Sequence, residues 1–275
     1  MSQRARGVAR SGLSSGNAPK LGRPRTNYWT LSTRPLHILC FLLPLVLIYE
    51  IGSAVHFAGS APGEHETIVA YRLIYDIFGL FGVSGLYLPG FLIVAVLLIW
   101  HLLTRDTWQV HAGVIAGMTV EAILWTLPLL VVGQIANRLV TGSPAPPPEA
   151  AVLAAELSAQ PWTARAILAI GAGVYEELVF RMVLIAAVHL LVVDLMGSRE
   201  FAGRAIAIGA AALAFALYHD VRATGGGIDG WRLIFYFSAG VFFGGLYVWR
   251  GFGIVVATHA LYDLAVLVLL RPPAS

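Results

Sequence analysis

The chain has 275 residues, of which 58% are hydrophobic and only 12% charged, with a formal net charge of +3. Ordinary soluble domains carry about a quarter charged residues, and a domain of this size leaves a large part of its surface exposed. The composition therefore excludes an ordinary soluble globular domain and favours a protein whose apolar surface faces lipid.

The first 35 residues form a segment rich in Gly, Ser, Pro and Arg that contains no acidic residue. Seven of the 18 Lys and Arg residues lie in it: Arg4, Arg6, Arg10, Lys20, Arg23, Arg25 and Arg34. It shows no hydrophobic periodicity, so we expect a disordered tail. Because it precedes an apolar run, the positive-inside rule places it in the cytoplasm, where membrane lipid is its expected partner. A basic tail also suits nucleic acid, but no recognition motif accompanies it, and no nucleic-acid partner is expected.

Seven apolar segments follow, most of them as long as an α-helix that crosses a bilayer. They cover about residues 36–57, 81–103, 110–135, 164–196, 201–219, 233–249 and 254–270. They are too long and too continuously apolar for barrel strands, so the predicted fold class is all-α, a polytopic transmembrane helical bundle of about seven spans. The fourth segment would be about 50 Å long against a bilayer core of about 30 Å, so we expect it to tilt, kink or protrude.

The chain divides into three predicted regions. Residues 1–35 are the basic cytoplasmic tail, residues 36–163 hold the N-terminal spans and a Pro-rich loop, and residues 164–270 form a catalytic membrane core. Residues 143–148 of the loop, Ser-Pro-Ala-Pro-Pro-Pro, are incompatible with a helix, and a short surface helix is expected at 149–158.

Ionisable side chains inside the spans are the main functional signal. Each costs about 2.5–3.5 kcal/mol at the bilayer centre, and such groups usually face the bundle interior. The spans carry Glu50, Glu121, Glu176, Glu177, Arg181, His219, His259 and Asp263. For Glu50 and Glu121 two interpretations stay open, a role beside the site or along the substrate path, or an interhelical hydrogen bond that satisfies the acid.

The other six fall into three short patterns, the first of which is Glu176-Glu177-Leu-Val-Phe-Arg181. On a helix, Glu177 and Arg181 stand at i and i+4, so they share a face and can pair. Glu176 lies about 100° around the same helix. It is therefore free to point into a cavity while its neighbour is held by the arginine.

The second pattern is Phe215-Ala-Leu-Tyr-His219, and the third is His259-Ala-Leu-Tyr-Asp263. In the third, the aspartate is close enough to orient the imidazole ring and select its tautomer. One carboxylate, Glu176, and two imidazoles can thus converge from three helices. A glutamate in a dry pocket can take a proton from water near neutral pH, and imidazoles can hold that water or donate to an oxyanion.

Glu-Glu-x-x-x-Arg, Phe-x-x-x-His and His-x-x-x-Asn or Asp, in this order on successive membrane helices, resemble the CAAX protease and bacteriocin-processing family. Its members are intramembrane glutamic endopeptidases related to the type 2 CAAX prenyl protease. The resemblance covers about residues 164–270. It implies that Glu176, together with His219, activates the water that attacks a peptide bond.

The resemblance also implies roles for the remaining pattern residues. It makes supporting residues of Glu177, Arg181 and Phe215. It places an oxyanion-stabilising site at His259 and Asp263. Family members often have asparagine at the last position; an ionised aspartate accepts hydrogen bonds only, so Asp263 is better suited to orienting His259.

No cofactor is expected, because the chain lacks His-Glu-x-x-His, and this favours a metal-free mechanism. Glutamate and histidine are also zinc ligands, so a zinc site at Glu176, His219 and His259 stays open as the alternative.

We therefore predict an endopeptidase that hydrolyses a peptide bond of a membrane-embedded or lipidated protein substrate. The predicted location is a bacterial plasma membrane, with several spans and a cytoplasmic N-terminus. One alternative is a non-catalytic membrane scaffold or bacteriocin-immunity-type protein that retains the fold; another is a transporter whose proton relay uses Glu50, Glu121 and Glu176. Close convergence of Glu176, His219 and His259 would favour the protease over both.

Overall fold

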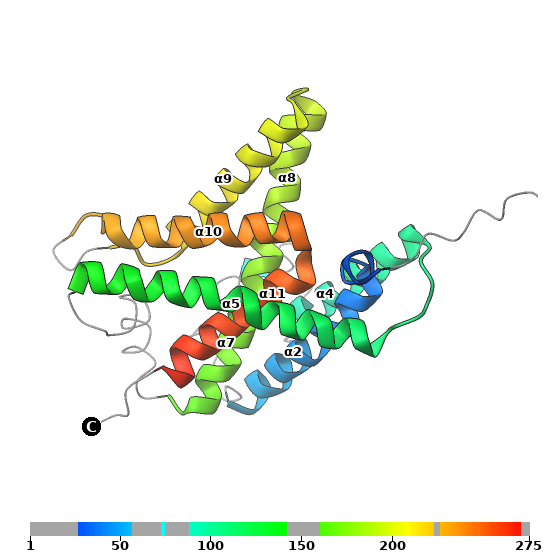
Figure 1. The fold of residues 1–275 in the computed structure, drawn as a ribbon, viewed down its shortest axis with the longest axis horizontal. Coiled ribbons are helices and arrows are strands. Elements are labelled where there is room, and N and C mark those ends of the chain that lie inside the picture. Colours follow the sequence, from blue (N-terminus) through cyan, green and yellow to red (C-terminus); the bar gives the residue numbers. More distant parts are fainter. Residues whose placement is uncertain (1–26, 57–72, 75–87, 142–159, 223–225, 271–275) are drawn as a thin grey trace, which may run out of the picture.

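The computed structural model describes residues 27–56, 73–74, 88–141, 160–222 and 226–270 (Figure 1). Their helices are α1 (Tyr28–Leu31), α2 (Pro35–His56), α4 (Leu88–Thr104), α5 (Ala112–Thr141), α7 (Trp162–Glu177), α8 (Ala186–His189), α9 (Glu200–Tyr218), α10 (Gly230–Arg250) and α11 (Phe252–Leu264). Three segments are π-helical: η2 (Leu178–Ile185), η3 (Leu190–Leu195) and η4 (Ala265–Leu269). Within the described ranges no β-strand occurs, so the predicted all-α fold class is confirmed.

Six helical runs in the described part are long and apolar enough to cross a membrane. They are Pro35–His56, Ala112–Ile135, Trp162–Leu195, Glu200–Tyr218, Gly230–Arg250 and Phe252–Leu269. A shorter apolar helix covers Pro89–Thr104. The prediction of a polytopic membrane bundle is confirmed, with six long runs and one shorter helix in place of seven spans. The start of the second predicted span, the residues of the tail up to 26, and the helix predicted at 149–158 lie outside the described residues. The expectation of disorder is wrong for the end of the tail, because Tyr28–Leu31 form α1 and Leu31 and Ser32 are buried.

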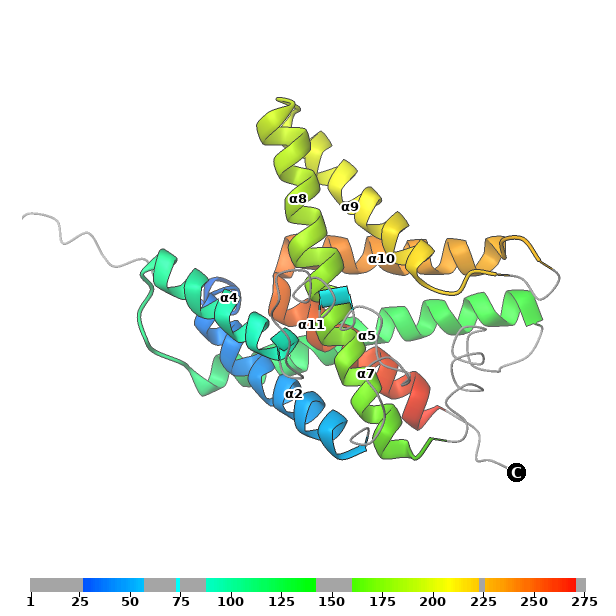
Figure 2. The same ribbon diagram turned by 180° about the vertical axis from the view of Figure 1, so that it is seen from behind.

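The fourth predicted span is one continuous run of 34 residues, from α7 through η2 and α8 to η3. Its far end pairs with the start of α9 as a hairpin that protrudes from the other helices (Figures 1 and 2). The expected protrusion is therefore present. The run changes to π-helical geometry at Leu178, directly after the Glu-Glu pair, and π-helical turns are frequent at functional sites.

Helix α7 lies against both α2 and α11 and is buried along most of its length. The contact with α11 is close because Gly173 has no side chain. A Cβ atom there would lie 2.6 Å from the backbone nitrogen of Ala260. This approach places the Glu-Glu pair, one turn further along α7, next to His259 of α11.

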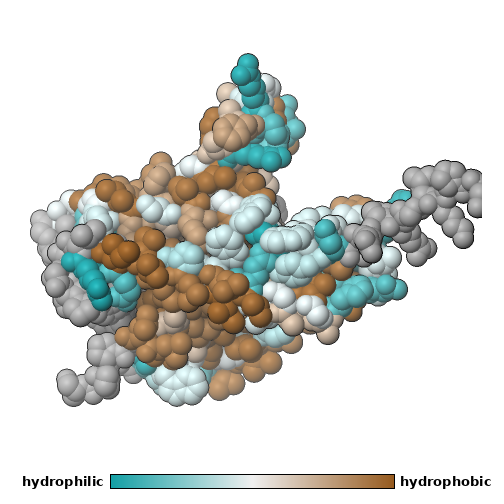
Figure 3. Space-filling model, in the orientation of Figure 1, coloured by the Kyte–Doolittle hydropathy of each residue, from teal (hydrophilic) through white to brown (hydrophobic). Residues whose placement is uncertain are grey.

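Many large hydrophobic residues are exposed, and Figure 3 shows hydrophobic residues gathered over the left and central part of the face that it displays. On α5 the exposed large hydrophobic residues are Val120, Ile123, Leu124, Leu127, Val131, Val132 and Ile135. A contiguous apolar surface of this kind is unfavourable in water and suits contact with lipid tails. The protein is an integral, multi-pass membrane protein.

Candidate active site

The three sequence patterns meet at the centre of the molecule, where α7 and η2, the end of α9, and α11 come together. Nε2 of His219 lies 3.8 Å from Oε2 of Glu176. Nδ1 of His259 lies 2.7 Å from Oε1 of Glu177. The structure therefore brings the residues of all three patterns into one cluster, which we call the motif cluster.

Glu177 is the structural centre of the motif cluster and is fully buried. Its Oε1 lies 2.8 Å from Nη1 of Arg181, which confirms the pair predicted from their spacing. The same oxygen accepts a hydrogen bond from Nδ1–H of His259. The guanidinium of Arg181 also lies 4.3 Å from the centre of the Phe215 ring, a distance at which a cation is attracted to an aromatic face. Glu177 thus joins η2 to α11, and Phe215 helps to hold the arginine.

Glu176 and Glu177 each have a buried Oε2 atom that accepts no hydrogen bond from the described residues. In Glu176, which is 6% exposed, this oxygen lies beside the imidazole of His219. Buried polar groups are nearly always hydrogen-bonded, and an exception calls for an explanation. His219, at 3.8 Å, is too far for a direct hydrogen bond and close enough for one small molecule to contact both groups.

His219 follows the last residue of α9, and its ring is restrained by a local hydrogen bond. Nδ1 lies 2.8 Å from the carbonyl oxygen of Phe215. A carbonyl only accepts, so Nδ1 carries the proton and donates. In the neutral ring Nε2 then bears the lone pair, and this is the nitrogen that faces Glu176. His219 can therefore accept a hydrogen bond at the free oxygen of the glutamate.

His259 has a carboxylate beside each ring nitrogen. Nδ1–H donates to Glu177, and Nε2 lies 3.5 Å from Oδ2 of Asp263, one turn along α11. The expected position of Asp263 beside the ring is confirmed. The stronger contact is with Glu177, and the sequence did not indicate it because 82 residues separate the two partners.

Glu121 belongs to a second polar group, which we call the Glu121 cluster, formed with Tyr28, Trp125 and Arg250. Tyr28 donates to Oε2 at 2.5 Å, Nη2 of Arg250 donates to the same oxygen at 2.8 Å, and Nε of Arg250 donates to Oε1. Nε1–H of Trp125 lies 3.4 Å from Oε1. Both oxygens thus have partners, as in the interpretation of Glu121 as a satisfied interhelical group. Burial, followed by the hydrogen bond to this carboxylate, raises the pKa of Tyr28 above its usual range, so the phenol stays a donor.

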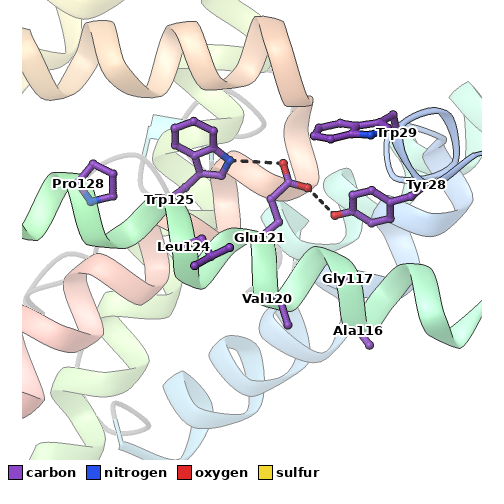
Figure 4. A pocket seen from close by; sticks show the side chains of 9 residues that line it. All are labelled: Tyr28, Trp29, Ala116, Gly117, Val120, Glu121, Leu124, Trp125 and Pro128. Atoms are coloured by element: carbon purple, nitrogen blue, oxygen red, sulfur yellow. Dashed lines mark hydrogen bonds between the residues drawn. The ribbon is translucent and has the colours of Figure 1, made fainter.

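The Glu121 cluster borders an open groove of about 660 Å³ between α1 and one face of α5. Figure 4 shows Glu121 between Tyr28 and Trp125, with apolar side chains of α5 along the rest of the groove. The groove contains none of the residues of the motif cluster.

Glu50 also has an interhelical partner. It lies on α2, is 9% exposed, and accepts a hydrogen bond from the hydroxyl of Tyr175 on α7. The ring of Tyr175 also packs edge-on against Tyr49, with ring centres 5.0 Å apart. The helix that carries Glu176 is thus tied to α2 at the residue before it.

The donor set does not suit a zinc ion shared by Glu176, His219 and His259. Both nitrogens of His259 face the carboxylates of Glu177 and Asp263, so that ring has no lone pair directed at the other two residues. Among the described residues, no three His, Cys, Asp or Glu side chains form a group that could hold a metal ion.

Two further residues contact the motif cluster and lie outside the three patterns. Tyr236 and Phe243, both on α10, stack on the rings of His219 and His259. Only their spacing of about two helical turns could have indicated that they share a face.

A family model described as type II CAAX prenyl endopeptidase Rce1-like matches residues 158–265. All members of the motif cluster lie in this range, whereas Glu50 and Glu121 lie outside it. No curated protein and no solved structure matches the chain.

Proposed function

Starting from the membership of residues 158–265 in the type II CAAX prenyl endopeptidase Rce1-like family, we propose how this CAAX-type membrane protease works. It hydrolyses a peptide bond of a membrane-embedded or lipidated protein with water that Glu176 and His219 activate. The observation that carries the proposal is the buried Oε2 of Glu176, which has no donor among the described residues and lies 3.8 Å from the Nε2 lone pair of His219.

One water can hydrogen-bond to Oε2 of Glu176 and to Nε2 of His219 at the same time, because each group accepts. The ionised glutamate takes one proton of this water while the imidazole holds the other hydrogen. The oxygen then bonds to the carbonyl carbon of the scissile peptide. The protonated Glu176 next donates to the leaving amide nitrogen, so the C–N bond breaks and the carboxylate is restored.

The tetrahedral intermediate carries a negative oxygen, for which His259 is the proposed donor. Its Nδ1–H donates to Glu177, which restrains the ring, whereas its contact with Asp263 is longer at 3.5 Å. Nε2–H can therefore donate to an oxyanion that lies beside it without loss of a short hydrogen bond. Such donors typically contribute about 10²–10³-fold in rate. Asp263 in this proposal orients the ring and does not bind the oxyanion.

Arg181, Glu177 and Phe215 support this arrangement and do not contact substrate. The guanidinium neutralises Glu177 and packs against the Phe215 ring. Because Phe215 also supplies the carbonyl that fixes His219, one short network orients both histidines. The mechanism needs no metal ion, and the N-terminal tail is proposed to lie in the cytoplasm.

The proposal is tested with purified protein in detergent, wild type and Glu176→Gln, on farnesylated and unmodified peptides that end in a C-a-a-X sequence. EDTA is present throughout. We expect the wild type to cleave a peptide, and the variant, with a melting temperature at or above that of the wild type, to lose about 10²–10⁴-fold in cleavage. Equal cleavage by both proteins would remove Glu176 from the mechanism, and cleavage that EDTA abolishes would require a metal. A folded wild type that cleaves none of these peptides would instead favour a scaffold that retains the fold.

A further inference from the structure

Helix α10 contributes no residue to the three sequence patterns, yet it covers both histidines of the motif cluster. The ring of Tyr236 stacks on His219, with centres 4.0 Å apart and planes at 25°. The ring of Phe243 stacks on His259, with centres 4.7 Å apart and planes at 20°. Each imidazole therefore has one aromatic ring from the same helix against its face.

The two aromatic residues are seven positions apart, which is about two turns, so they lie on one side of α10. The start of this helix is fixed by Asp229, whose side chain accepts hydrogen bonds from the backbone nitrogens of Trp231 and Arg232 at 3.0 and 3.2 Å. The start of the helix is thus fixed about two turns before Tyr236.

The packing of α10 on α9 sets how closely Tyr236 and Phe243 approach the motif cluster. Gly240 lies between the two aromatic residues, and a Cβ atom on it would lie 2.7 Å from Cα of Ala212 on α9. Only glycine permits this approach, since the neighbouring atom belongs to the backbone. Helix α9 in turn carries Phe215 and ends beside His219, so both helices that contact the His219 ring are held at a fixed distance.

The hydrogen bonds of the motif cluster do not by themselves fix the imidazole planes. His219 is anchored at Nδ1 by the Phe215 carbonyl, and His259 is anchored at Nδ1 by Glu177. Such a hydrogen bond restrains rotation about the Cβ–Cγ bond but still lets the ring swing through a small angle, which would move Nε2 away from its target. A stacked aromatic face removes this motion, because the swing would separate the two faces or make them clash.

We propose that Tyr236 and Phe243 are positioning residues, which hold the Nε2 atoms of His219 and His259 in the orientation that water activation and oxyanion binding require. This inference rests on the proposed function for its catalytic consequence. The stacking itself can be measured without any substrate, so the two can fail separately.

Tyr236 gives the cleaner test. Phe243 is 2% exposed and its ring also lies 5.2 Å from the guanidinium of Arg181, so its removal disturbs the core. Tyr236 is only partly buried. The variants are Tyr236→Leu, which removes the ring, Tyr236→Phe, which keeps the ring, and Phe237→Leu, a matched change at the adjacent residue, which is 38% exposed.

The first readout is the NMR spectrum of protein labelled at histidine Cε1, in detergent micelles. The chain has eight histidines, and the signal of His219 is assigned by its loss in His219→Asn. Stacking places the His219 ring over the face of Tyr236, so its ring proton is shifted upfield. We expect this shift to be lost in Tyr236→Leu and kept in Tyr236→Phe and Phe237→Leu. An unchanged His219 signal in Tyr236→Leu would overturn the inference whether or not the protein cleaves any peptide.

The second readout is peptide cleavage that depends on Glu176. Since a displacement of about 1 Å at a catalytic group can cost about 10²-fold, we expect Tyr236→Leu to lower kcat about tenfold with little change in KM. Tyr236→Phe and Phe237→Leu should stay near wild type. A kcat of Tyr236→Phe as low as that of Tyr236→Leu would assign the effect to the hydroxyl and overturn the role of the ring. A wild type without Glu176-dependent cleavage would contradict the proposed function and leave the NMR result to decide the stacking.

Discussion

Glu121 and Glu176 each stand in an apolar helix and are both largely enclosed by the bundle, but their carboxylates differ in their partners. Glu121 receives donors on both oxygens from Tyr28, Trp125 and Arg250. Glu176 keeps one buried oxygen without a donor among the described residues. The oxygens of Glu121 accept hydrogen bonds that stabilise the fold. Oε2 of Glu176 can still accept a hydrogen bond from water or a peptide.

Structural and reactive acids in a membrane chain can be separated by the partners of their carboxylate oxygens. A buried polar group without a hydrogen bond costs about 1–3 kcal/mol, so a fold keeps one only where something else requires it. Burial alone does not identify the reactive acid, because Glu50 is also buried and has a hydrogen bond from Tyr175. The unpartnered Oε2 beside Nε2 of His219 distinguishes Glu176 from Glu50 and Glu121. Glu177 also has an unpartnered Oε2, but its Oε1 is held by Arg181 and His259.

The largest difference between the motif cluster and the Glu121 cluster is expected when the arginine of each cluster is replaced. Arg181→Met leaves Glu177 buried without its cation, and removal of one partner from a buried pair costs about 3–5 kcal/mol. We expect a lower melting temperature and the loss of peptide cleavage, because Glu177 also holds His259. Thermal unfolding in detergent and cleavage by the folded fraction measure the two effects.

Arg250→Met is the matched change in the Glu121 cluster. Tyr28 and Trp125 still donate to Glu121 in this variant, so the melting temperature should fall less than in Arg181→Met. Cleavage per folded molecule should stay near wild type. Loss of cleavage in Arg250→Met at a temperature where it is fully folded would mean that the Glu121 cluster takes part in catalysis.

A smaller effect is expected at His219. Replacement by Asn removes the Nε2 lone pair beside Glu176 and leaves a polar side chain of smaller size. A positioned acid or base typically contributes about 10²–10⁴-fold; because Glu176 remains, we expect kcat to fall about 10²-fold, at the low end of that range, with a small change in stability. Steady-state kinetics on the peptide that the wild type cleaves decide this. Wild-type kcat in His219→Asn would show that the imidazole does not hold the water.

The smallest effect is expected at Tyr175. Tyr175→Phe leaves the buried acceptor Glu50 without this donor, which costs about 1–3 kcal/mol, and cleavage by the folded protein should be largely retained. Glu50→Gln keeps an acceptor for the Tyr175 hydroxyl and serves as the control, with a melting temperature closer to wild type. A larger loss of stability in Glu50→Gln than in Tyr175→Phe would contradict a structural role of the hydrogen bond from Tyr175 to Glu50.

The fold class and the three patterns could be predicted because they depend on local features. Uninterrupted apolar length indicates a spanning helix, and a spacing of four residues indicates the pair of Glu177 and Arg181. The partners of the other acids could not be predicted, because the hydrogen bonds of Glu50 with Tyr175 and of Glu121 with Arg250 join residues 125 and 129 positions apart.

The contacts of α10 with the two histidines could not be predicted from the sequence either. Tyr236 and Phe243 are ordinary aromatic residues of an apolar helix, and their function as neighbours of the histidines depends on how closely α10 packs on α9. That distance depends on Gly240 and Ala212, which carry no signal of chemistry in the sequence.

The most direct test of the account compares Glu176→Gln with Glu121→Gln in one experiment that records both melting temperature and peptide cleavage. Glu176→Gln removes a carboxylate whose Oε2 has no donor, so it should melt at or above the wild-type temperature while cleavage falls about 10²–10⁴-fold. Glu121→Gln removes the charge opposite Arg250, so it should melt at a lower temperature and still cleave once folded. The account is contradicted if Glu176→Gln cleaves at the wild-type rate, or if Glu121→Gln is the inactive variant at a temperature where both are folded.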